Sequence, residues 1–267
     1  MALLEVKNLT KEFGGLKAVN DVSFKVEEKS IVGLIGPNGA GKTTIFNLIT
    51  GVYATTLGEI RFNGEIIQKK PTHEIIQMGI TRTFQNIRLF KKLTVYENIV
   101  TACHNNVNYS FWEAMLLGTL PKFLSKKTRM KKQELMIKER AEQLMEVLNL
   151  TDRRDSIASN LPYGIQRRLE IARALAANPK LLLLDEPAAG MNPEETERLM
   201  ELIVEIKEKF NVSILLIEHH MDLIMGICDK IVVLNFGCKL SEGDPAEIQN
   251  NSKVREAYLG GVADVEG

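Results

Sequence analysis

A glycine-rich stretch, Gly36 to Thr43, carries the residues of this chain best suited to chemistry. Its letters, GPNGAGKT, fit the pattern G-x-x-x-x-G-K-[ST], and a second hydroxyl follows at Thr44. In such a turn, successive backbone N–H groups point toward one centre, and the dipole of the following helix adds positive charge. This suits a chain of phosphates, with Lys42 at the β- and γ-phosphates and the Thr43 hydroxyl on Mg²⁺. The sequence therefore predicts a nucleoside triphosphate site at Gly36, Pro37, Asn38, Gly39, Ala40, Gly41, Lys42, Thr43 and Thr44.

Two acidic residues, Asp185 and Glu186, come directly after an apolar run. A carboxylate at the end of a buried strand can hold Mg²⁺ through water, opposite Thr43, and Asp185 has this position. Glu186 can orient and polarise the water that attacks the γ-phosphate. His219 ends the next predicted strand and can reach the γ-phosphate, although an ordinary histidine at a strand end is the competing interpretation. These residues predict hydrolysis of the bound nucleotide.

Strands and helices must alternate to bring these groups together. Short apolar segments typical of buried strands occupy residues 31–35, 181–184, 213–217 and 230–235. Asn192 and Pro193 have the residue types of an N-cap and first helical position, and predict a helix to about residue 210. Strands separated by helices favour a parallel or mixed sheet, with its ligand at the carboxyl ends of the strands.

Two other regions differ from this pattern. Residues 3–9, 22–26 and 58–62 alternate in hydropathy, and Asn63-Gly64 is a hairpin turn signal, so we expect a small antiparallel β layer. Residues 86–160 favour helices, with a capping box at Thr94 to Glu97 and helical apolar spacing over residues 135–150. The sequence also predicts a short strand at 81–84, ending at Gln85, and a helix over residues 165–177.

Composition limits the classes of function. The 267 residues suffice for one or two domains, and 34 basic against 34 acidic residues give a formal charge of zero. No global positive field therefore indicates nucleic acid as a partner. Three cysteines without a C-x-x-C pair indicate reduced thiols in a cytoplasmic chain. The start lacks the features of a signal peptide, and the apolar runs are too short to span a membrane.

The order of these motifs resembles that of the ATPase subunits of ABC transporters, over nearly the whole chain. The resemblance implies an α/β fold: a P-loop (RecA-like) nucleotide-binding core with an antiparallel β subdomain and an inserted all-helical subdomain. It implies a single domain over residues 1–267, with 1–85 and 166–267 as the core and 86–165 as the helical signature subdomain. ATP and Mg²⁺ are the implied cofactors.

The resemblance also implies roles for further residues. Gln85 would contact Mg²⁺ or the attacking water, and Phe13 would stack on adenine. His219 would be the switch histidine, and residues 189–192 would form the D-loop. The signature would be Leu161, Pro162, Tyr163 and Gly164 followed by Ile165, and it departs from the usual Leu-Ser-Gly-Gly-Gln at Pro162, Tyr163 and Ile165. The D-loop aspartate is replaced by Asn192.

Within that family the chain is most similar to the ATP-binding subunits of branched-chain amino acid importers. The segments that carry this likeness are residues 79–85, 163–164, 186–193, 217–219 and 257–260. The implied partners are a second ATPase subunit, two transmembrane permease subunits and, indirectly, a solute-binding protein, with the chain on the cytoplasmic face of the membrane. The alternatives are an ABC ATPase without a transport role, a GTPase or kinase, and a nucleotide sensor that does not hydrolyse. The first lacks the expected second cassette or coiled coil, the second lacks Asn-Lys-x-Asp, and Glu186 argues against the third.

Overall fold

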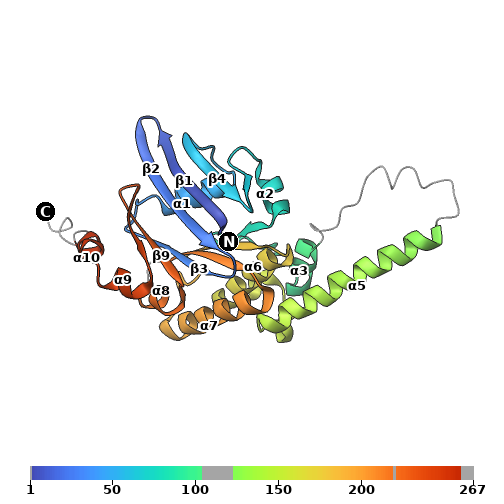
Figure 1. Ribbon diagram of the computed structural model, residues 1–267. Helices are drawn as coiled ribbons and strands as arrows, with labels where there is room; N and C mark the ends of the chain where they lie inside the picture. Colours follow the sequence, from blue (N-terminus) through green and yellow to red (C-terminus); the bar gives the residue numbers. More distant parts are fainter. Residues whose placement is uncertain (1, 104–122, 219–220, 260–267) are drawn as a thin grey trace. The chain divides into compact units, whose positions relative to one another are not determined.

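The computed structural model describes residues 2–103, 123–218 and 221–259 (Figure 1). The chain divides into two compact units, one formed by residues up to 86 and from 179 onward, the other by residues 87–178. We call these the core unit and the helical unit. The sequence prediction ended the helical subdomain at residue 165, directly after the signature motif. In the structure the whole of the helix that follows belongs to the helical unit. The functional subdivision at residues 86–165 stays a prediction.

An antiparallel sheet forms the first layer of the core unit. Its strands are β1 (Ala2–Phe13), β2 (Leu16–Glu27), β4 (Leu57–Phe62) and β5 (Glu65–Ile66), in the order β2-β1-β4-β5. The predicted β layer is confirmed, but β1 and β2 are longer than expected. The two strands stay paired up to a turn at Gly14-Gly15, through several register shifts. At such irregularities the alternation of apolar and polar residues is broken, so the sequence pattern did not show the full length of the strands.

A six-stranded sheet forms the second layer, in the order β10-β9-β3-β8-β7-β6. All neighbouring strands are parallel except β10, which pairs antiparallel with β9. The mixed sheet is therefore confirmed; β10 was not predicted, since its polar residues lack a clear period. The strands are β3 (Ile31–Ile35), β6 (Ile80–Arg82), β7 (Leu181–Asp185), β8 (Ser213–Ile217), β9 (Lys230–Asn235) and β10 (Cys238–Gly243).

The two faces of this sheet have different neighbours. Leu181 and Leu183 of β7 belong to a core cluster with Phe46 of helix α1 (Lys42–Ile49) and with side chains of the antiparallel sheet. On the opposite face, Gly33 lies against Ile224 of helix α8 (Met221–Ile227). Successive side chains of a strand point to opposite faces, so Asp185 shares the face of Leu181 and Leu183. The acidic end of β7 is thereby directed to the layer that contains α1.

Two of the remaining helices of the core unit, α7 and α9, begin at a capping box. Asn192 and Glu195 form a capping box at the start of α7, as do Asp244 and Glu247 at α9. The predicted cap at Asn192 is confirmed, with Glu195 N donating to Asn192 Oδ1 at 2.9 Å. The helices are α2 (Thr72–Met78), α7 (Pro193–Phe210), α9 (Pro245–Gln249) and α10 (Ser252–Leu259).

Three helices dominate the helical unit: α3 (Val95–Cys103), α5 (Phe123–Val147) and α6 (Tyr163–Ala176). The predicted capping box before α3 is confirmed, because Glu97 N donates to Thr94 Oγ1 at 3.1 Å and Thr94 N to Glu97 Oε2 at 2.8 Å. Helix α6 packs against both α3 and α5. Among the described residues, no helix is both long and apolar enough to cross a membrane.

Candidate functional site

The glycine-rich loop joins β3 to α1, as predicted. Gly39 and Gly41 have φ angles of 78° and 98°, which side chains strongly disfavour. A Cβ atom at Gly41 would lie 2.6 Å from the carbonyl oxygen of Ala18, and one at Gly36 would lie 2.3 Å from that of Leu234. The loop is therefore pressed between two neighbouring backbone segments, and its shape requires glycine at these positions.

Lys42 is held inside this loop. Its Nζ donates to the carbonyl oxygens of Gly36 at 2.7 Å and Pro37 at 2.9 Å, and the residue is only 6% exposed. Burial lowers the pKa of Lys42, while the nearby charges of Glu186 and Asp185 act in the opposite direction. The loop lysine and the two predicted acidic residues thus belong to one electrostatic cluster. Thr43, the second residue of α1, is exposed.

Glu186 and Gln85 are brought together by the parallel sheet. Gln85 Nε2 donates to Glu186 Oε2 at 2.9 Å, although the two residues are 101 positions apart in sequence. Glu186 has a φ angle of 47°, in the left-handed region, and its N–H donates to Ile217 O at 2.9 Å. A non-glycine residue in this conformation costs roughly 1–2 kcal/mol. Such strain is typical of functional sites, where the surrounding hydrogen bonds hold it in place.

Arg82 is a site residue that the sequence analysis missed. Its Nη2 donates to Asp185 Oδ2 at 2.6 Å, in an ion pair whose side chains are 7% and 3% exposed. Its Nη1 donates to Asn47 Oδ1 on α1, also at 2.6 Å. The alternation of side chains along β6 could have indicated it. Ile80 joins the core cluster, so Arg82, two residues later, faces the same layer and needs a buried partner.

Glu218 is the second residue missed. It is 2% exposed, and its Oε1 accepts from Ala188 N at 2.8 Å. This contact ties the segment after Glu186 to the end of β8. A carboxylate directly after a buried strand was visible in the sequence, but its target was not. The adjacent His219, the predicted switch histidine, lies outside the described residues.

Phe13 ends β1 and is 41% exposed. Its ring meets that of Tyr53 edge-on, with centroids 5.3 Å apart and planes at 79°. Lys11 Nζ lies 4.7 Å from the centre of the Phe13 ring. An exposed aromatic ring supported at its edge is able to stack on a flat ligand.

The signature residues belong to the helical unit. Leu161 is buried, Pro162 is the N-cap of α6, and Tyr163 is 43% exposed with its hydroxyl accepting from Arg167 Nη2 at 3.0 Å. The prediction that this helix begins near Ile165 was wrong by two residues. Pro162 has extended backbone angles and its carbonyl accepts the first helical hydrogen bonds, so the helix begins at Tyr163. Gly164 therefore lies in the first turn.

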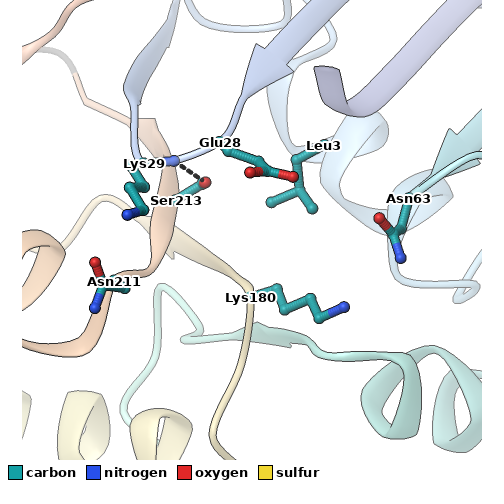
Figure 2. A pocket seen from close by; sticks show the side chains of 7 residues that line it. All are labelled: Leu3, Glu28, Lys29, Asn63, Lys180, Asn211 and Ser213. Carbon is teal, nitrogen blue, oxygen red and sulfur yellow. Dashed lines mark hydrogen bonds between the residues drawn. The ribbon is translucent and has the colours of Figure 1, made fainter. Parts of the chain in front are cut away.

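One surface pocket of the core unit lies away from these groups (Figure 2). Its residues include Lys180, which precedes β7, and Ser213, which begins β8, so it is at the amino ends of the parallel strands. Lys29 N donates to Ser213 Oγ at 2.8 Å. None of the predicted site residues is among the residues that line it: Leu3, Glu28, Lys29, Asn63, Lys180, Asn211 and Ser213.

Comparison with known proteins agrees with this geometry. Residues 19–189 match the family model described as ABC transporter, and residues 238–264 match that described as branched-chain amino acid ATP-binding cassette transporter. A crystal structure of the ADP conformation of an ATP-binding cassette of an ABC transporter has a TM-score of 0.81 and 32% identity, covering 97% of this chain and 99% of that one. The chain belongs to the ABC transporter family, as one of its ATP-binding cassettes. It is therefore a nucleotide-binding ATPase.

Within that family it groups with the ATP-binding proteins of branched-chain amino acid transport. It is 50% identical to the high-affinity branched-chain amino acid transport ATP-binding protein BraF of Pseudomonas aeruginosa, over 97% of this chain and 98% of that protein. It is 46% identical, with the same coverage, to the corresponding protein LivG of Escherichia coli. Both the predicted fold class and the predicted family are confirmed.

Proposed function

We propose that this chain is the ATP-hydrolysing subunit of an importer for branched-chain or related amino acids. The observation that supports this most is the joint presence of the P-loop constellation and a C-terminal segment that matches branched-chain amino acid cassettes. The names of the relatives point the same way, because BraF and LivG are both branched-chain amino acid transport proteins. An ABC ATPase without a transport role has no comparable support.

The proposed nucleotide site uses the loop and the exposed aromatic of the core unit. Backbone N–H groups of the loop from Gly39 to Thr44 that are not already bonded within it, together with the Lys42 ammonium, bind the phosphates, and Phe13 stacks on adenine. Lys42 has three N–H donors, of which two contact loop carbonyls, so one donor remains for a phosphate oxygen.

The residues also fit a magnesium ion bound together with the nucleotide. Among the described residues, no group of three or more His, Cys, Asp or Glu side chains is arranged to hold a metal. Mg²⁺ is usually held by one or two protein ligands and by phosphate oxygens, rather than by an all-protein cage. The Thr43 hydroxyl, the Asp185 carboxylate and the Gln85 amide would hold it here. The ion would neutralise charge that develops on the phosphates.

Glu186 is the proposed general base. Its carboxylate accepts from Gln85 Nε2, so the amide orients one carboxylate oxygen, and the other can accept a proton from water. We assign Gln85 to orienting Glu186 and the water, and His219 to contacting the γ-phosphate. Proton acceptance by Glu186 leaves hydroxide to attack phosphorus, and the bond to the leaving ADP oxygen breaks.

The proposed working assembly contains two such cassettes and two membrane permeases. The signature residues Leu161 to Gly164 lie in a different compact unit from the P-loop, which is consistent with contacting ATP held by a second cassette. ATP bound between two cassettes would favour one conformation of the permeases, and hydrolysis would release it. In this proposal the chain lies at the cytoplasmic face of the membrane, and the solute-binding protein acts on the other side.

The test is transport by a reconstituted complex. The chain, its permeases, its partner cassette and the solute-binding protein are placed in vesicles with ATP inside, and uptake of labelled leucine is measured. We expect uptake that requires ATP and is abolished in Glu186→Gln. ATP hydrolysis without uptake of leucine, isoleucine or valine would contradict the proposed substrate class.

A further inference from the structure

We infer that Arg82 is a positioning residue of the ATPase site, which fixes the Asp185 carboxylate relative to helix α1. The inference rests on the proposed function in one respect, since it takes Asp185 and Thr43 as the residues that hold Mg²⁺. It adds a residue outside the motifs of the nucleotide site. The basis is a bridge of two hydrogen bonds, from Arg82 to Asp185 and to Asn47.

Strand register explains why these side chains meet. In the pairing of β6 with β7, Arg82 lies opposite Leu183, so Asp185 is two positions farther along the neighbouring strand. Both side chains face the layer that contains α1, as argued above from strand parity. Such diagonal neighbours are within reach of a long side chain. Asn47 lies one helical turn beyond Thr43 on α1, so the bridge connects the elements that carry two of the three proposed metal ligands, Thr43 and Asp185.

The surroundings of this bridge favour arginine over lysine at position 82. The guanidinium lies against the rings of Phe46 and Phe84, each with its centroid 5.3 Å from Cζ. Its planar fork places two N–H groups on two different acceptors at 2.6 Å. A lysine ammonium has no comparable fixed fork and loses more side-chain freedom for each hydrogen bond formed. Arg82 therefore sets the orientation of Asp185, not only its charge.

The use of one carboxylate oxygen has a functional consequence. Arg82 donates to Oδ2 of Asp185, so the other carboxylate oxygen would be the one that serves a bound Mg²⁺. Without Arg82, the Asp185 carboxylate would lose the hydrogen bond that holds Oδ2 and would be free to rotate. A positive charge near the site also repels a cation, and this effect alone would lower Mg²⁺ affinity. The two effects predict opposite changes in Mg²⁺ affinity.

The experiment measures binding of an N-methylanthraniloyl-labelled ADP to the full chain, first in EDTA and then as Mg²⁺ is added. For Arg82→Gln we expect the affinity for labelled ADP in EDTA to lie within about twofold of wild type. The Mg²⁺ concentration that gives half of the full Mg²⁺-dependent change in ADP binding should rise on the order of tenfold. In Arg82→Lys the Mg²⁺ requirement should lie between those of wild type and Arg82→Gln. Asn47→Ala keeps the buried charge pair and should give a smaller rise, about threefold.

Arg61→Gln is the matched control, because Arg61 pairs with Glu59 on β4, in a partly exposed ion pair. It should leave the Mg²⁺ dependence unchanged. If Arg82→Gln does not fold, Asn47→Ala decides the matter. An unchanged or lower Mg²⁺ requirement in either variant would overturn the inference. Thr43→Ala and Asp185→Asn test the proposed metal site itself: if both keep the wild-type Mg²⁺ dependence, that site is wrong, independently of Arg82.

Discussion

Replacement of Lys42 by methionine separates the contribution of its charge to ATP binding from any contribution to the fold. Two of its three N–H groups are held by the carbonyls of Gly36 and Pro37, which leaves one for phosphate. A hydrogen bond to a charged group contributes roughly 1.5–3 kcal/mol, so its loss should weaken ATP binding about 10- to 150-fold. Stability should change little, because burial disfavours the charge, as the lowered pKa of Lys42 indicates.

The assay is isothermal titration calorimetry with ATP and Mg²⁺, with thermal unfolding of the nucleotide-free protein measured in parallel. Methionine has a similar length and an apolar side chain, so it fills the same buried position. ATP affinity within twofold of wild type would refute the assignment of Lys42 to the phosphates. A large drop in the unfolding temperature of the variant would contradict the expected small change in stability. It would show that the contacts of Lys42 with the carbonyls of Gly36 and Pro37 mainly hold the loop.

Two further substitutions, a thiol-labelling pattern and a pH dependence have outcomes that follow from local structure. Gly36→Ala should weaken ATP binding at least about tenfold, judged by calorimetry, because its Cβ would lie 2.3 Å from a backbone oxygen that cannot move aside cheaply. Pro162→Ser should raise ATP hydrolysis by the assembled complex, since it offers a hydroxyl to the facing phosphate; equal activity with the same partners would leave proline a turn-setting role only. Burial raises the pKa of Cys103 to about 11 and of Cys228 to about 12, so iodoacetamide at pH 8 should label exposed Cys238 first, as read by mass spectrometry. The stability that these two neutral thiols contribute is present below their ordinary pKa of 9.0 and is lost as pH rises through 11 and 12, which alkaline unfolding curves would show.

The sequence predicted the nucleotide core well because its elements are set by local signals. The strands at 213–217 and 230–235 and the cap at Asn192 are found where expected. These features depend on apolar runs and on capping chemistry, which act over a few residues. The start of α6 was misplaced by two residues, because the proline before it is an N-cap and not a part of the preceding loop.

The bridge from Arg82 to Asp185 was out of reach of the sequence. It depends on β6 lying beside β7 and on the register of that pairing, which no pattern within either strand reveals. The contact of Glu218 with Ala188 N is similar, since it joins the ends of two neighbouring strands. The motifs identified which residues do the chemistry, whereas the sheet register determines which residues hold them in place.

The most direct test of the account is a single turnover of radiolabelled ATP by the assembled complex, comparing wild type with Glu186→Gln. The amide keeps the size of the side chain and its hydrogen bonding with Gln85, but it accepts a proton from water far less readily. We predict that the variant binds ATP as tightly as wild type and releases phosphate at least roughly 100-fold more slowly, the lower end of what a general base contributes. Phosphate release at the wild-type rate would contradict the assignment of Glu186 as the group that activates the attacking water.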